Sequence, residues 1–195
     1  MTATFINSFI LFFVTIDTIG NLPFFLSLTE GAKIKKRNQI ALKSIIIAFF
    51  IMITFAYLGR YLLEAIHVSL DSLKIAGGVI LMLLAIDILF EKRKIRREKR
   101  VEEALDEKNF EEIIVFPIAI PFIAGPSALT TIILLIGNYA NFPEFQIPVI
   151  LALVAALIVS LVLMIGANFI VKYIPQQILH ATARVMAFIL AALAT

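Results

Sequence analysis

The chain has 195 residues, of which 61% are hydrophobic and 16% are charged, and its net charge is +3. Soluble domains contain about 45–50% apolar residues, so this composition and the recurring apolar runs of about 20 residues predict an all-α integral membrane protein. The lack of cysteine excludes disulfides, thiol catalysis and cysteine metal sites. No nucleophile motif, metal-ligand spacing or phosphate-binding loop is present, so we expect no enzyme activity, no metal and no cofactor.

The apolar segments predict six transmembrane helices. In chain order they cover residues 5–28, 39–63, 73–90, 113–136, 146–171 and 178–195. The charged residues 91–112 are expected to form a solvated cytoplasmic linker between a first three-helix repeat, 1–90, and a second, 113–195. Basic residues concentrate in the loops after the first, third and fifth segments. These loops are therefore expected to face the cytoplasm, with both termini outside the cell membrane.

Polar and helix-breaking residues interrupt the first apolar segment. The stretch from Asp17 to Pro23 also contains Gly20 and Asn21. An ionisable side chain at bilayer depth costs at least about 2.5 kcal/mol, and proline removes a helix hydrogen bond. Freed backbone groups at that depth are tolerated where they line a protein-enclosed or wet site. We therefore predict a helix that is broken at Gly20 and lines a site.

The fourth apolar segment carries a second stretch of the same kind, with Pro117, Pro121, Gly125 and Pro126. The predicted break lies at Gly125. An odd number of spans in each half makes the second half enter the membrane from the opposite side. The chain is therefore predicted to be two inverted three-helix repeats with discontinuous helices one and four, a plan that recurs in secondary transporters. The alternative is that a six-span chain divides into two triplets without any repeat.

Two interrupted helices expose backbone groups of both polarities. N–H groups at the start of a half-helix bind anions, and the carbonyl groups at the end of one attract cations. An α-amino acid carries this pattern of charge, so the residues at the breaks form the candidate substrate-binding set. The set is Asp17, Gly20, Asn21, Gly125, Pro126, Ser127 and Thr130.

Asp17 is the residue that we single out, as a partner for an ammonium group or as a carrier of a proton or cation. Intramembrane acids usually face a site or a cavity. The alternative is a polar bridge between helices, made to Asn21 or to Arg184. For the hydroxyls of Thr130 and Thr131, the sequence does not decide which one faces the pocket.

Two motifs resemble the signatures of the MarC family of integral membrane proteins. They are DTIGNLPFFL, residues 17–26, and IAIPFIAGPSALTT, residues 118–131. The resemblance covers essentially the whole chain and implies six spans in two inverted repeats. The family includes SnatA-type transporters of small neutral amino acids, such as glycine and alanine, driven by ion gradients. This chain departs from the family pattern at Thr18, where proline is usual, and at Ser127, where glycine is frequent.

The breaks and the resemblance together favour a secondary transporter of small neutral amino acids that works by alternating access. The expected partners are the amino acid, a coupling ion (proton or sodium) and membrane lipid, with no nucleic acid. Two hypotheses from other classes stay open, a non-transporting membrane scaffold and a small-solute channel. The sequence leaves the substrate range, the coupling ion, the direction of transport and the oligomeric state undecided, a homo-oligomer being one option.

Overall fold

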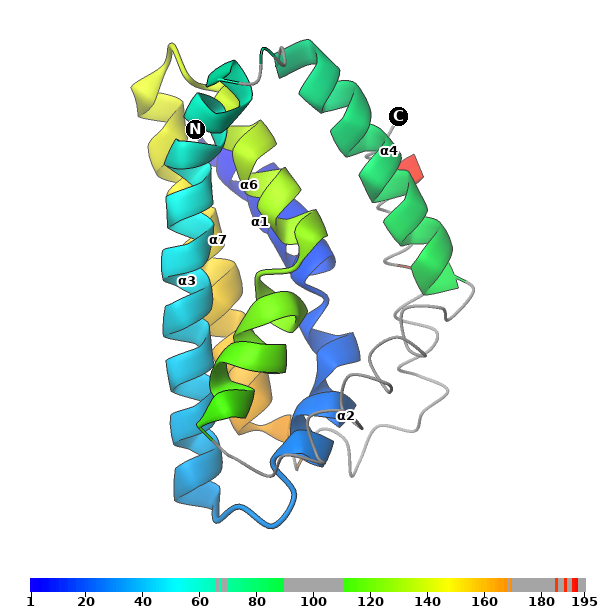
Figure 1. Cartoon of the computed structure of the whole chain (residues 1–195), viewed down its shortest axis with the longest axis vertical. Coiled ribbons are helices and arrows are strands. Elements are labelled where there is room, and N and C mark those ends of the chain that lie inside the picture. Colours follow the sequence, from blue (N-terminus) through cyan, green and yellow to red (C-terminus); the bar gives the residue numbers. More distant parts are fainter. Residues whose placement is uncertain are drawn as a thin grey trace.

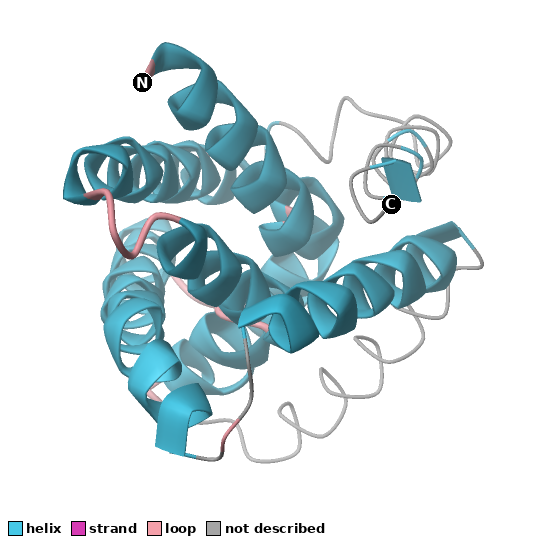
Figure 2. Ribbon diagram, turned by 90° about the horizontal axis from the view of Figure 1, so that it is seen from above, coloured by secondary structure: helices cyan, strands magenta, loops and turns pink. Residues whose placement is uncertain are grey.

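The computed structural model describes residues 1–65, 67, 70–89, 111–167 and 169, and four residues near the C-terminus, 185, 188, 191 and 192. All regular structure in these residues is helical, as predicted (Figure 2). In chain order the elements are α1 (Thr2–Ile16), α2 (Thr18–Leu28), α3 (Ile34–Ala65), α4 (Leu70–Leu89), the irregular helical segment η1 (Ile114–Ile123), α6 (Pro126–Asn138) and α7 (Pro143–Ile165) (Figure 1).

Three stretches of the described residues have the length and composition needed to cross a membrane. They are Thr2–Leu28, Ile34–Gly59 and Pro143–Ile165. A fourth is added if η1 and α6, which are bent by 57°, count as one span. The structure thus shows several apolar helices suited to a multi-pass membrane protein. Helix α4 covers residues 73–89 of the predicted third span. Residues 91–110 of the linker, and the predicted sixth span apart from four residues, lie outside the described residues.

Two helix ends differ from the sequence prediction by five residues or more. Helix α3 begins at Ile34, five residues before the predicted start. Its 32 residues extend over about 48 Å at about 1.5 Å each, which exceeds the roughly 30 Å hydrocarbon core. The additional turns at its start carry Lys35, Lys36 and Arg37. Helix α7 ends at Ile165, with Gly166 as its C-cap, whereas the predicted span continued to residue 171.

The broken segments pack against each other and against the long helices α3 and α7. Helix α1 packs along α7, while α3 packs against η1, α6 and α7. Helix α2 contacts α7 and η1, and α4 contacts α6 beside the rest of the bundle (Figure 1). Six of the seven elements, α4 being the exception among the described residues, contribute fully buried apolar side chains to one core, and these include Phe12, Leu22, Met52, Ile118, Ile132 and Leu153. The rings of Phe24 and Phe122 meet with their centroids 6.1 Å apart, which joins α2 to η1.

Candidate functional site

The first break lies at Asp17, so the predicted position at Gly20 was wrong. Asp17 has the left-handed backbone conformation φ 51°, ψ 53°, ending α1 and starting α2. Aspartate tolerates this conformation better than most residues do. Its carboxylate also accepts a hydrogen bond from the Gly20 backbone N–H, with Oδ1 and N 3.3 Å apart, which is the usual role of an N-cap. The helix therefore resumes at Thr18, and Gly20 lies inside the first turn of α2.

The second break lies at Gly125, as predicted. Before it, Phe116 and Ile120 have extended backbones with φ near −125°, because the proline that follows each of them disfavours the helical region. Helix α6 then starts at Pro126, where the missing N–H costs nothing. A Cβ atom on Gly125 would lie 2.5 Å from the carbonyl oxygen of Pro121. Only glycine therefore fits at this position without a backbone shift.

The two breaks meet through a reciprocal pair of hydrogen bonds. Asn21, which follows the first break, donates from Nδ2 to the Phe122 carbonyl before the second break, at 3.0 Å. Ser127, which follows the second break, donates from Oγ to the Thr15 carbonyl before the first, at 3.3 Å. Figure 1 shows the interruption between η1 and α6 beside the lower part of α1. Residues more than 100 positions apart thus form one site at the meeting of both breaks.

The Asn21 side chain is buried, with 3% of its surface exposed. Its Nδ2 also donates to the Ile16 carbonyl, at 2.9 Å, so both amide hydrogens are used. Its Oδ1 is buried and has no hydrogen-bond partner among the described residues. A buried acceptor left unpaired costs about 1–3 kcal/mol. The oxygen is therefore a place where a donor from a water or a ligand would be stabilised.

The carbonyl groups beside the breaks were expected to attract a cation. Three of them already accept hydrogen bonds from side chains. Ile16 and Phe122 accept from Asn21, and Thr15 accepts from Ser127. In this conformation the carbonyl groups at the ends of α1 and η1 are therefore occupied by the side chains of Asn21 and Ser127.

Helices α2 and α6, which each follow a break, differ in how their first turns are capped. The first turn of α2 is capped by the Asp17 carboxylate. Helix α6 has Gly125 as its N-cap and no side-chain cap. Because uncapped N–H groups and the positive end of the helix dipole favour an anion, the start of α6 is better suited than the start of α2 to bind a carboxylate from a ligand.

The hydroxyls of the predicted site residue Thr130 and its neighbour Thr131 are both used inside α6. Thr130 Oγ1 donates to the Pro126 carbonyl, and Thr131 Oγ1 donates to the Ser127 carbonyl, each at 2.8 Å. Thr131 is buried, whereas Thr130 is partly exposed. Their oxygens can still accept a hydrogen bond from a ligand.

Helix α7 contributes a residue that sequence reasoning missed. The Ser160 hydroxyl donates to the Ala156 carbonyl at 2.8 Å. Its oxygen also contacts the Thr18 hydroxyl, at 2.5 Å. Since each hydroxyl has one hydrogen, Thr18 is the donor in this pair. Both side chains are buried, so α7 fixes the first residue of α2. A serine within the long apolar run of α7 was the available signal.

Asn21 and Arg184 were the two bridging partners predicted for Asp17. Arg184 lies outside the described residues.

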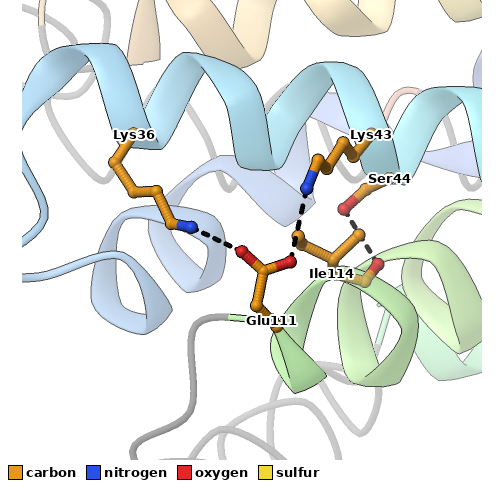
Figure 3. Close-up of polar contacts among 5 residues, drawn as sticks. All are labelled: Lys36, Lys43, Ser44, Glu111 and Ile114. Carbon is orange, nitrogen blue, oxygen red and sulfur yellow. Dashed lines mark hydrogen bonds and ion pairs between the residues drawn. The ribbon is translucent and has the colours of Figure 1, made fainter.

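An ion-pair cluster fixes the beginning of η1 on α3, away from the breaks (Figure 3). Glu111 Oε1 lies 2.5 Å from Lys36 Nζ, and its Oε2 lies 3.3 Å from Lys43 Nζ. Ser44 donates to the Ile114 carbonyl at 2.9 Å. The hydrogen bonds from Lys36 and Lys43 lower the pKa of Glu111 below 4.5. This cluster holds the segment that leads into the second break.

Comparison with known proteins identifies the family. The family described as "MarC family integral membrane protein" matches residues 2–195. The chain is 36% identical over 193 residues to an UPF0056 membrane protein of Archaeoglobus fulgidus, covering 97% of this chain and 88% of the relative. It is 31% identical over 189 residues to one of Methanocaldococcus jannaschii, covering 97% and 82%. It is 28% identical over 190 residues to the UPF0056 inner membrane protein YhgN of Escherichia coli, covering 97% and 91%. No solved structure is significantly similar. The chain belongs to the MarC family of integral membrane proteins.

Proposed function

We propose that this protein is a secondary transporter of small neutral amino acids of the glycine and alanine class. It works by alternating access in the cell membrane and is coupled to a proton or sodium gradient. The observation that carries the proposal is Asn21, whose buried Oδ1 lacks a partner among the described residues while its Nδ2 joins both breaks. A buried acceptor at the meeting of two broken helices is suited to an ammonium donor.

The proposed substrate lies between the two second half-helices. Its carboxylate binds at the uncapped start of α6, near Ser127. Its ammonium group lies toward Asn21 Oδ1 and Asp17. A small side chain suits this site because Asn21, Ser127 and Phe122, which lie at the meeting of the breaks, are all buried. The start of α6 faces the carboxylate, and Asn21 and Asp17 face the ammonium group. Both charges of the zwitterion therefore have a partner.

Asp17 has two roles in this proposal. Its carboxylate caps α2, and its negative charge attracts the ammonium group or the coupling ion. The Asp17→Asn variant separates the roles, because asparagine retains the oxygen needed for the cap and also tolerates the left-handed conformation. It removes only the charge.

The test is uptake of radiolabelled glycine and alanine into proteoliposomes, under a proton or a sodium gradient, by the wild type and by Asp17→Asn. Glu111→Gln serves as the control, because it neutralises one carboxylate away from the breaks. We expect saturable uptake by the wild type, a loss of at least tenfold in Asp17→Asn and little change in Glu111→Gln. No wild-type uptake under either gradient would refute the transporter. Undiminished uptake by Asp17→Asn would remove the charge of Asp17 from the mechanism.

The uptake assay, together with thermal-shift and co-purification measurements, separates the transporter from the other two hypotheses. Flux that does not saturate with glycine concentration would indicate a channel. A wild-type protein that shows no thermal shift with any amino acid, and that co-purifies with a membrane partner, would indicate a scaffold. Saturable, gradient-driven uptake is expected from a carrier alone.

A further inference from the structure

We propose that Asn21 and Ser127 form an interlock, a pair of side chains that closes the two breaks on one another. It must open before a ligand can use the carbonyl groups beside them. The part that concerns opening stands on the geometry alone. The part that concerns the ligand rests on the proposed function.

Three backbone carbonyls beside the breaks already accept hydrogen bonds from side chains. The Thr15, Ile16 and Phe122 carbonyls lie at the ends of the half-segments, where the backbone carries partial negative charge. The chain places the Asn21 amide and the Ser127 hydroxyl on these oxygens. An ammonium group would seek the same acceptors, so the two side chains stand in for the N–H groups of a ligand.

The hydrogen bonds of Asn21 and Ser127 cross between the two breaks. Both side chains are buried, Asn21 with 3% and Ser127 with 6% of their surface exposed. Each bond joins the segment after one break to the segment before the other. Moving α1 and α2 away from η1 and α6 therefore breaks both bonds together. A broken bond leaves a buried polar group unpaired unless water or a ligand replaces its partner. The pair thus favours the closed arrangement of the breaks.

Removing the Ser127 hydroxyl should change the affinity for the ligand, and the direction of that change depends on the role of the hydroxyl. If Ser127 binds the ligand through its hydroxyl, removing that hydroxyl weakens ligand binding. If the hydroxyl must instead be displaced from the Thr15 carbonyl, removing it raises the population of the binding-competent state and strengthens binding. Ser127→Ala therefore distinguishes an interlock from a direct contact.

The matched control is Ser44→Ala. Ser44 is also buried, and its hydroxyl also donates to a backbone carbonyl of the η1–α6 segment, that of Ile114, at 2.9 Å. The two substitutions remove the same chemical group. They differ in place, because Ser44 holds the beginning of η1 and Ser127 lies at the break.

The experiment measures backbone amide hydrogen exchange and glycine binding by calorimetry, on the full chain in detergent. Loss of one net hydrogen bond corresponds to a change of about fivefold. We expect Ser127→Ala to speed exchange about fivefold in both segments 15–22 and 122–129. We also expect it to lower the Kd for glycine by a similar factor. Ser44→Ala should speed exchange near residue 114 alone and leave the Kd unchanged. Ser127→Cys provides a second variant if Ser127→Ala does not fold, because cysteine retains the shape of serine but is a weak donor. It should also speed exchange and lower the Kd for glycine.

Unchanged exchange in segment 15–22 of the Ser127 variants would overturn the interlock. Ser127 lies outside that segment and can affect it only through the contact between the two breaks. Equal or weaker glycine binding by variants with faster exchange would also overturn it, in favour of a direct contact. A wild type that binds no glycine would refute the proposed function, and the exchange result alone would then decide the interlock.

Discussion

Replacing Gly125 with alanine tests whether the second break depends on the close approach of two backbone segments. The alanine Cβ would lie 2.5 Å from the Pro121 carbonyl oxygen, whereas ordinary contact begins at 3.4 Å. The two backbones must therefore separate by roughly 0.9 Å, a crowding of the kind that costs about 1–3 kcal/mol. The backbone conformation of Gly125 is extended, φ −79° and ψ 168°, so steric contact alone causes this cost.

The assay is thermal unfolding in detergent, compared with glycine uptake in proteoliposomes. For a soluble chain of this length, 1 kcal/mol changes the Tm by about 2–4 °C, so Gly125→Ala should lower the Tm by several degrees and also reduce uptake. The control is Gly31→Ala. Gly31 has φ +82° with nothing within 4 Å of an added Cβ, so alanine there is strained locally but leaves the breaks intact. It should lower the Tm without reducing uptake. A Gly125→Ala protein with wild-type Tm and uptake would refute the close-approach argument.

Three further predictions concern the cap, the hydroxyl pair and the ion-pair cluster. Asp17→Ala should unfold about 1–2 kcal/mol more easily than the wild type in denaturant titrations, because alanine cannot cap α2 and disfavours the left-handed conformation, while Asp17→Asn should stay close to wild type. Ser160→Ala should cost about 1–2 kcal/mol because it leaves the Thr18 hydroxyl without its acceptor, and adding Thr18→Val should then cost little more. Since the pKa of Glu111 is lowered from 4.5, its ion pairs should stabilise the fold above pH 4.5 and lose this effect as the pH falls through the lower native value. The wild-type Tm should therefore fall toward that of Glu111→Gln at acidic pH.

Equal stability of Asp17→Ala and Asp17→Asn would show that the cap does not hold the first break. Strictly additive effects at Thr18 and Ser160 would show that the two hydroxyls are not coupled. A constant Tm difference between the wild type and Glu111→Gln across the acidic range would show that the cluster does not contribute through the charge of Glu111.

The sequence by itself determined the membrane character and the position of the second break, because both follow from local chemistry. Apolar runs require a nonpolar surrounding, and a proline disfavours the helical region for the residue before it, which agrees with the extended backbones of Phe116 and Ile120. The first break was placed three residues too late. Gly20 is the more flexible residue, but Asp17 can both take the left-handed conformation and cap the next helix.

Only the tertiary structure decided which groups meet. Asn21 finds the Phe122 carbonyl and Ser127 finds the Thr15 carbonyl across more than 100 residues. Ser160 reaches Thr18 from α7, a helix with no break of its own. These contacts depend on how whole helices pack and rotate against each other, which no spacing along the chain specifies. The sequence can show that a residue such as a buried amide needs a hydrogen-bond partner. The packing of the helices determines which group that partner is.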